Sequence, residues 1–435
     1  MNWKWLTVGM MLFSFAAGAQ EKPVAWDLRT CIEYARAKNI RIQQSRIGLE
    51  ESLENTREAK AQRLPSLSFS SGHNYVNRPR PEAGDKNSYS GSYDLSSSVT
   101  LYGGGRLRKN LQQMELRNEV QELTIREAEN NIELAITQAY VQLLYAHENV
   151  KINEHTVEVS KAQRDRGEQL LEAGALSRAD FAQLESQYTT AKYQLVVAQT
   201  SLENARLDLK QLLELELDDT MEPAIPEIGE EEVLVLLPSK ASVYQTSLGV
   251  MPEVKYNRLN IEVAGLEKEK AWAGYLPSLR LSAGMGTSHS TGSNWGWGSQ
   301  MKHNWSENVG LTLSVPIFSN RSTKTAVNLA KLNVQQAELG YEDVQKDLLK
   351  SVETVYQDAL SAQERYRSAA ENLKAVELAF ELTQEQFFLG MKNTLEMLTE
   401  KNNYLSARQE LVQAKYMAVL NVQLLNFYQG KEIKL

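Results

Sequence analysis

Residues 305–317 read WSENVGLTLSVPI, and their odd-numbered positions are mostly apolar while the even-numbered ones are small or polar. The apolar set is Trp305, Val309, Leu311, Leu313, Val315 and Ile317, and the polar set is Ser306, Asn308, Gly310, Thr312 and Ser314. Successive side chains of a β-strand point to opposite faces of its sheet. The alternation therefore predicts a strand with one apolar face and one polar face.

Three further segments show the same alternation, namely residues 67–75 (LSFSSGHNY), 93–101 (YDLSSSVTL) and 279–286 (LRLSAGMG). A soluble sandwich would carry Lys and Glu on its polar face, whereas these polar faces consist mainly of Ser, Thr, Gly and Asn. Aromatic residues flank the apolar face, namely Tyr75, Tyr89, Tyr93, Trp295, Trp297 and Trp305. Lipid-facing and lumen-facing residues alternate in this way in transmembrane β-barrels, and aromatic girdles mark their two interfaces. We therefore expect four membrane strands, joined through polar loops at 77–88 and 290–304.

Four strands are too few to close a barrel, and an open sheet edge in lipid leaves unpaired backbone groups that cost several kcal/mol each. The chain is therefore expected to oligomerise. Two copies would give eight strands and a barrel filled by side chains, whereas three copies would give twelve strands and a pore. A homotrimer is the simplest solution for a channel.

The chain is duplicated, and its prolines mark the boundaries of the copies. No proline lies between positions 82 and 222 or beyond 316, which leaves room for long helices because proline breaks a helix interior. Residues 61–67 (AQRLPSL) match 273–279 (AGYLPSL) at an offset of 212, and Gly174 and Tyr188 match Gly390 and Tyr404 at an offset of 216. We predict a first repeat at 20–215, an equatorial linker region at 216–250 and a second repeat at 251–435. Each repeat contains a helix, a strand hairpin (about 65–102 and 277–318), a long helix, a tip turn near 174 or 390 and a returning helix.

The helical parts show the periodicity of a coiled coil. Apolar residues spaced alternately four and three apart run through 348–380, and a second seam runs from Phe181 to Leu212. This period of 3.5 residues is the seam of a coiled coil. From Arg106 to about Ala173 the helical pattern is nearly unbroken, which predicts a helix roughly 100 Å long.

The N-terminus has the features of a secretory signal peptide, predicted to span residues 1–19. Lys4 provides a positive charge, residues 5–15 are mostly apolar, and Ala17-Gly18-Ala19 offers a cleavage site. No later segment approaches 18 consecutive apolar residues, so no transmembrane helix is expected. The formal net charge of −8 argues against nucleic-acid binding.

The ordered motifs resemble those of TolC-type outer-membrane efflux proteins. The resemblance rests on LPSL at 64–67 and 276–279, on the strand exits TLYGG at 100–104 and PIFSN at 316–320, and on the glycine turns at 174 and 390. It implies a mostly α-helical fold with a transmembrane β part, in which three chains form a 12-stranded β-barrel. Long coiled-coil helices would form a periplasmic α-barrel, so the location would be the outer membrane of a Gram-negative bacterium, with outer-membrane lipid around the strands. The implied partners are a periplasmic adaptor and an inner-membrane pump of the RND or ABC type.

The resemblance also implies roles for residues at the far tips of the helices. The acidic ring at the pore constriction falls on Glu396, the second acidic position of the family is Thr399 here, and Glu400 is its neighbour. The latch between neighbouring tip helices falls on Phe387 and on a contact between Lys392 and Asp180. As an alternative, Asp180 and Glu396 are acidic residues that favour the start of a helix through its dipole. The turns expected to dock the adaptor comprise Gly174, Ala175, Leu176, Ser177, Gly390, Met391, Asn393 and Thr394.

No catalytic, metal-binding or cofactor-binding pattern stands out. The five histidines show no i, i+4 pairing and no cysteine partners, and no nucleophile elbow or P-loop occurs. We therefore expect the exit duct of an efflux or secretion system and not an enzyme. A periplasmic coiled-coil scaffold or an adaptor protein is the alternative, although neither needs four alternating strands in a duplicated chain. The cargo is not identified by the sequence.

Overall fold

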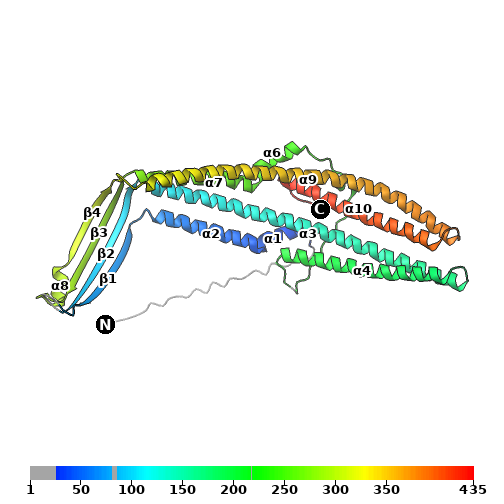
Figure 1. Ribbon diagram of the computed structural model, residues 1–435, viewed down its shortest axis with the longest axis horizontal. Coiled ribbons are helices and arrows are strands. Elements are labelled where there is room, and N and C mark those ends of the chain that lie inside the picture. Colours follow the sequence, from blue (N-terminus) through cyan, green and yellow to red (C-terminus); the bar gives the residue numbers. More distant parts are fainter. Residues whose placement is uncertain (1–25, 81–85, 217) are drawn as a thin grey trace, which may run out of the picture.

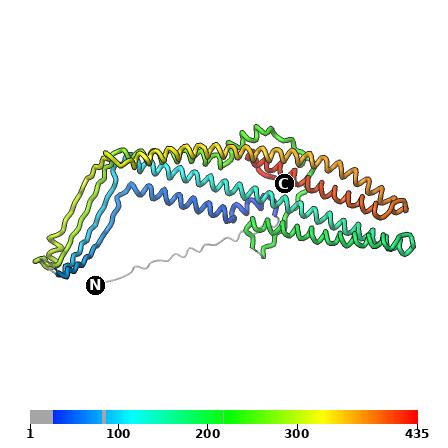
Figure 2. The backbone as a smooth tube through the Cα atoms, viewed as in Figure 1, coloured from blue at the N-terminus to red at the C-terminus, as the bar shows by residue number. Residues whose placement is uncertain are grey.

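The computed structural model describes residues 26–80, 86–216 and 218–435, so the predicted signal peptide lies outside the described residues. Within this range the protein is elongated, with a β-sheet at one end and two helical tips at the other (Figure 1). Helices run side by side next to the sheet, and helical hairpins form the far end (Figure 2). This division separates a strand region, an upper helical region and two hairpin tips.

The sheet contains the four predicted strands: β1 (Ser66–Asn77), β2 (Asn87–Gly103), β3 (Ser278–Ser290) and β4 (Ser306–Ser314). They are antiparallel in the order β1-β2-β3-β4, so the hairpins of the two copies lie next to each other. Phe69, Leu95 and Met285 are cross-strand neighbours on one face, while Ser68, Ser96 and Gly284 are neighbours on the other. The apolar and polar faces predicted by the alternation are therefore formed.

Three details of the sheet differ from the sequence prediction. The strands have 12, 17, 13 and 9 residues instead of a uniform length near ten, and β2 continues past an irregularity between Thr100 and Tyr102. β4 ends at Ser314, before Val315 and Ile317, because Pro316 lacks the N–H group that a strand ladder requires.

The third difference is a short helix, α8 (Trp297–His303), in the segment predicted to be an irregular loop. Thr287 donates a hydrogen bond to the Met301 carbonyl, and the Gln300 side chain accepts one from the Ser290 N–H. These contacts tie α8 to the end of β3, so the helix depends on tertiary contacts that the local sequence does not contain.

The helices reproduce the duplication residue by residue. α3 (Arg106–Glu172) and α9 (Ser322–Phe388) each have 67 residues, and α4 (Arg178–Leu212) and α10 (Thr394–Tyr428) each have 35. Both the starts and the ends of these pairs differ by 216, for example 322 − 106 and 428 − 212. At 1.5 Å per residue, α3 is roughly 100 Å long, as predicted.

The helices before the strands correspond at the smaller offset. α1 (Leu28–Lys38) and α6 (Lys240–Val250) differ by 240 − 28 = 212, and α2 (Ile40–Ala61) and α7 (Pro252–Trp272) differ by 252 − 40 = 212. A short 3₁₀ turn, η1 (Ala273–Tyr275), follows α7, and α5 (Glu230–Val233) lies between the repeats. α6 falls inside the segment 216–250 that was expected to be a linker, although it is the counterpart of α1.

α3 packs along α4 and α9 packs along α10, which gives two coiled-coil hairpins (Figure 1). Ala191, Ala198 and Ala205 are buried on α4 at intervals of seven residues. At the offset of 216 their counterparts on α10 are Ala407, Ala414 and Asn421, which are buried as well. Small side chains at the seam let the helix axes approach closely.

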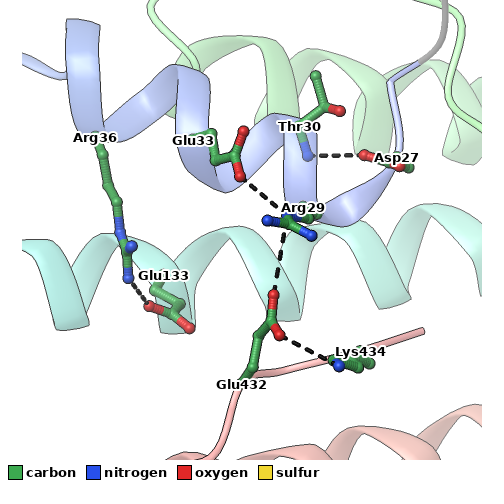
Figure 3. A network of polar contacts seen from close by, with 8 residues as sticks. All are labelled: Asp27, Arg29, Thr30, Glu33, Arg36, Glu133, Glu432 and Lys434. Carbon is green, nitrogen blue, oxygen red and sulfur yellow. Dashed lines mark hydrogen bonds and ion pairs between the residues drawn. The ribbon is translucent and has the colours of Figure 1, made fainter.

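The main hydrophobic core lies at the equator, where α1, α3, α9, α10 and the C-terminal segment meet. The hydroxyl of Tyr140 on α3 donates to the Ala224 carbonyl at 2.6 Å and lies 3.1 Å from the Trp26 carbonyl, which joins the connection between the repeats to the start of the first. On the surface nearby, Arg29 of α1 lies between Glu33 and Glu432 of the C-terminal segment (Figure 3). Such exposed ion pairs add little stability. The contact between the two repeats is therefore stabilised mainly by the buried core.

Candidate functional site

The two helical tips have the same backbone conformation. At each tip a glycine ends the first helix with a positive φ, 71° at Gly174 and 74° at Gly390. The amide N–H of Ala175 donates to the Leu170 carbonyl, and that of Met391 donates to the Gln386 carbonyl. This pattern is the Schellman motif, in which glycine adopts the left-handed conformation without steric cost. The expected turns are therefore formed at positions 174 and 390, each with the backbone hydrogen bond of a Schellman motif.

Side-chain caps start the returning helices. Ser177 accepts a hydrogen bond from the N–H of Asp180, and Asn393 accepts one from the N–H of Glu396. Glu396 in turn accepts a hydrogen bond from the N–H of Asn393, which completes a capping box. The expected role of these acids at a helix start is thus present in the structure.

Glu396 also forms an ion pair with Lys392, with Nζ and Oε1 2.7 Å apart. This hydrogen bond from Lys392, together with the backbone bond from Asn393, holds the pKa of the Glu396 carboxyl below its ordinary value. Glu396 therefore carries a charge at neutral pH, but a lysine of its own chain lies against that charge.

The other two residues expected at the constriction have local partners. Thr399 donates to the Leu395 carbonyl at 2.9 Å, within its own helix. Glu400 accepts a long hydrogen bond of 3.4 Å from Asn403. Both residues lie one helical turn after Glu396 but form their hydrogen bonds with other residues, and a ring formed between chains stays a prediction.

The expected latch residues are separated within one chain. Lys392 pairs with Glu396, and the Asp180 carboxylate accepts a hydrogen bond from Ser177 at 2.6 Å. Phe387 is buried in a small core with Leu184, Phe380 and Met397, where its ring contributes to packing. A contact of Lys392 with Asp180 of a neighbouring chain stays a prediction.

The second tip exposes more apolar surface than the expected docking residues indicate. Met391 is 70% exposed, and Leu389 and Leu395, which the sequence analysis did not select, are also exposed. Thr394 is buried, and so it is not available on the surface for a partner. Singly exposed apolar residues are ordinary, but three within seven residues at a turn form a patch suited to protein contact.

A lysine that the sequence analysis did not select joins the two hairpins above the tips. Lys401 on α10 is 1% exposed, and its Nζ donates to Ser160 Oγ at 2.7 Å and to Gln163 Oε1 at 2.8 Å, both on α3. Burial lowers the pKa of this ammonium group to about 8. Ser160 is a buried polar residue of α3, and the hydrogen bond that it accepts from Lys401 provides a reason for a polar side chain at this position.

The predicted aromatic girdle lies at the loop end of the sheet. Tyr75 and Tyr89 are cross-strand partners near that end, Trp295 and Trp297 belong to the segment around α8, and Trp305 directly precedes β4. His73, Tyr93 and His289 pack among these rings. All six predicted residues thus mark one interface only.

A second group of exposed aromatic residues lies at the helix end of the sheet. Tyr102 on β2, Trp272 at the end of α7, and Tyr275 in η1 are exposed. Tyr93 and Tyr102 are 102 − 93 = 9 residues apart on β2, or roughly 30 Å along a strand. For a strand tilted by about 40° this corresponds to the apolar band of roughly 25 Å found in outer-membrane barrels. The sequence analysis missed this group because two of its members lie outside the strands.

The described residues contain no group of three or more His, Cys, Asp or Glu side chains that could hold a metal ion. None of the described helices combines the length and the hydrophobicity needed to cross a bilayer.

The sequence profile of the family described as outer membrane efflux protein matches residues 31–214 and 243–431. The chain belongs to the outer membrane efflux protein family. It is 22% identical over 429 residues to outer membrane protein TolC of Escherichia coli (strain K12), an alignment that covers 96% of this chain and 84% of the relative. It is 25% identical over 359 residues to alkaline protease secretion protein AprF of Pseudomonas aeruginosa, covering 80% of this chain and 70% of the relative.

The fold agrees with solved members of the same architecture. Crystal structures of CusC match with a TM-score of 0.81 and 18% identity, and the match covers 95% of this chain and 96% of that chain. The predicted resemblance to TolC-type proteins is therefore confirmed. This family member is an outer-membrane channel protein of the efflux and secretion type, with its strands in the outer membrane and its helices in a periplasmic tunnel.

Proposed function

We propose that three copies of this chain form a closed 12-stranded barrel that continues into a helical tunnel, and that this duct passes substrates outward without chemical change. One observation carries the proposal. In the described part of the chain, β1 and β4 each pair with a strand on one side only, and the sheet has one apolar and one polar face. A sheet of this kind in lipid requires partners at both edges, and three sheets enclose a pore whereas two do not.

The tips are the proposed docking surface for a periplasmic adaptor, which would connect the duct to an inner-membrane pump of the RND or ABC type. The turns around Gly174 and Gly390 are closed by backbone hydrogen bonds, and the exposed Leu389, Met391 and Leu395 supply apolar contact area. Buried apolar anchors contribute most of the binding free energy at protein interfaces. The second tip is therefore expected to contribute more than the first.

Glu396 is the proposed selectivity residue at the periplasmic mouth. Its carboxylate is charged at neutral pH, and three copies around an axis would attract cations and repel anions. The local pair with Lys392 reduces the net charge of each copy, so the ring is a moderate filter and not a strong one.

The test is a conductance measurement on the purified protein in planar lipid bilayers. A trimeric duct is expected to give discrete single-channel steps, and addition of an adaptor to the tip side should change the open probability. Purified protein that inserts but never conducts, with or without an adaptor, would contradict the duct and favour a non-transporting scaffold.

A further inference from the structure

A groove lined by lysines lies where the helices meet the sheet. It has a volume of about 680 Å³ and spans α3, α7, η1 and α9. Its charged lining residues are Lys109, Lys268, Glu269, Lys324 and Lys331, and its aromatic lining residues are Trp272 and Tyr275. Four lysines and one glutamate give a local net charge of +3, in a chain whose formal net charge is −8. This concentration of positive charge is therefore specific to one place on an acidic protein.

The groove lies on the outer side of the helical layer. A second cavity at the same height is lined by Thr100, Ser278, Arg280 and Ser314. Thr100 pairs with Arg280 and Ser278 pairs with Ser314, at the helix end of the polar sheet face. On α7 this second cavity is lined by residues 270 and 271, whereas the lysine groove is lined by residues 268, 269 and 272. A helix turns about 100° per residue, so the two sets lie on opposite sides of α7. The lysine groove thus shares a side with the apolar face of the sheet, which in a family member contacts lipid.

The groove directly continues the apolar face of the sheet. Tyr102 is the cross-strand partner of Leu279, and Leu279 is the partner of Leu313 in the last apolar row. Trp272, 53% exposed, and Tyr275, 45% exposed, line the groove next to this row. The order from membrane to periplasm is therefore aliphatic residues, then aromatic residues, then lysines. Aromatic side chains and then basic ones occupy the interface and headgroup levels of membrane proteins.

The groove lies between neighbouring helices of one chain, with Lys324 and Lys331 on α9 and its other lysines on α3 and α7. α7 packs against α3 on one side and against α9 on the other, and α2 packs against the far side of α3. A sister chain that pairs with β1 would therefore approach α2, and one that pairs with β4 would approach α9 from the side that faces away from α7. From Lys324 to Lys331 the lysines extend roughly 10 Å along α9, which is comparable to a headgroup layer of about 5–8 Å on each side of a bilayer.

Only one lysine of the groove has a carboxylate partner inside it. Lys109 lies 2.6 Å from Glu269, whereas Lys268, Lys324 and Lys331 form no ion pair with any carboxylate of the described residues. These three ammonium groups can therefore pair with an external anion. The neighbouring Trp272 and Tyr275 offer an apolar surface for the glycerol and upper acyl part of a lipid.

We propose that this groove binds the headgroup of an anionic phospholipid from the periplasmic leaflet, with Lys268, Lys324 and Lys331 around the phosphate and Trp272 against the glycerol region. The proposal rests on the outer-membrane location and not on the gating or cargo of the duct. The bound lipid would hold the bend between strands and helices at the level of the membrane surface.

The experiment is native mass spectrometry of the detergent-purified full oligomer, titrated with phosphatidylglycerol and, separately, with phosphatidylcholine. The wild-type protein should bind phosphatidylglycerol more tightly. The triple variant K268Q/K324Q/K331Q should lose at least about tenfold of that preference, since each lysine near an anionic surface contributes about fivefold. A matched control, K346Q/K350Q/K374Q, changes three exposed lysines farther along α9 and should keep the wild-type preference.

Equal binding of the two lipids by the wild-type protein, or an unchanged preference in the groove variant, would overturn the proposal. Displacement of phosphatidylglycerol by millimolar inorganic phosphate would also overturn it, because the groove would then recognise free phosphate. Single-channel conductance of the same samples separates this inference from the proposed duct. A conducting channel without lipid preference contradicts only the lipid site, whereas a lipid-binding protein that never conducts contradicts only the duct.

Discussion

Lys401 on α10 donates a hydrogen bond from Nζ to Ser160 Oγ on α3 over 2.7 Å, across 241 positions of sequence. The same ammonium group donates to Gln163 Oε1, and so one buried charge joins the second hairpin to the first. The groups around the adjacent cavity are His155 of α3, Glu377 and Glu381 of α9, and Tyr404 of α10. Within the described part of the chain neither carboxylate forms an ion pair with Lys401, so the ammonium group is compensated by the neutral oxygen atoms of Ser160 and Gln163.

Replacement of Lys401 by Met should stabilise the protein at neutral pH. The pKa of Lys401 is lowered from 10.5 to about 8 in the folded protein, so the unfolded chain binds more protons between these values. Stability therefore rises as pH increases from about 8 to 10.5, and a penalty of up to about 3 kcal/mol is present below pH 8. K401M lacks this penalty and should unfold at a higher temperature than the wild type at pH 7, with the difference shrinking towards pH 10.

Thermal unfolding in detergent at a series of pH values measures this difference. K374M, at an exposed lysine of α9, serves as the control and should follow the wild type at every pH. A K401M protein that is less stable than the wild type at pH 7 would mean that the hydrogen bonds to Ser160 and Gln163 outweigh the cost of burial.

Substitutions at Lys392 and Glu396 should change ion selectivity in opposite directions. K392Q removes the cation that lies 2.7 Å from Glu396 and should increase the preference for cations, whereas E396Q should decrease it. The pKa of Glu396 is below its ordinary value of 4.5, so the carboxylate should stay charged when the pH falls to that value. Without Lys392 the pKa should return towards 4.5, so K392Q should lose selectivity at a higher pH than the wild type.

Reversal potentials in planar bilayers under a salt gradient give this selectivity. E371Q, at an exposed glutamate of α9 outside the tip, is the matched control and should leave the reversal potential unchanged. Identical reversal potentials for the wild type, K392Q and E396Q would exclude a role for this pair in ion selection.

Glycine is required at position 104 for a steric reason that does not apply at position 105. Both glycines have positive φ, 64° and 81°, at the bend between β2 and α3. A Cβ atom at Gly104 would lie 2.9 Å from the Ala273 carbonyl oxygen and 2.9 Å from Leu276 Cβ, whereas one at Gly105 would meet open space. G105A should cost about 1–2 kcal/mol for the left-handed backbone alone, and G104A should cost more because a backbone oxygen cannot move aside cheaply.

Thermal unfolding of G104A and G105A in the same detergent compares the two positions directly. Each variant is the control for the other, since both change glycine to alanine in the same bend. Equal unfolding temperatures would show that the close approach of Ala273 in η1 and of Leu276 to Gly104 does not contribute to stability.

Most of the architecture could be predicted from the sequence because its signals are local and repeated. The alternation at residues 305–317 predicted both faces of β4, and the proline-free interval with its 3.5-residue period predicted the long α3. The duplication can be detected in the sequence because α3 and α9 have equal length and lie in the same helical layer, so that corresponding residues keep a constant offset.

The parts that sequence reasoning missed depend on distant partners. Lys401 has the same local pattern as a solvated lysine, and its burial follows from Ser160 and Gln163, which lie 241 and 238 positions away. α8 depends on hydrogen bonds that Thr287 and Ser290 of β3 donate to Met301 and Gln300 of the helix. Trp272 and Tyr275 follow Lys268 just before the LPSL motif, and such a cluster of aromatic and basic residues is typical of a membrane interface. The two aromatic residues lie outside the alternating segments, so the strand pattern does not indicate them.

The most direct test of the account is the mass of the native oligomer, measured in detergent by native mass spectrometry or light scattering. A trimer is the predicted result, because the open edges of three four-stranded sheets then pair with one another. A monomer that stays folded and soluble in water without detergent would contradict the account.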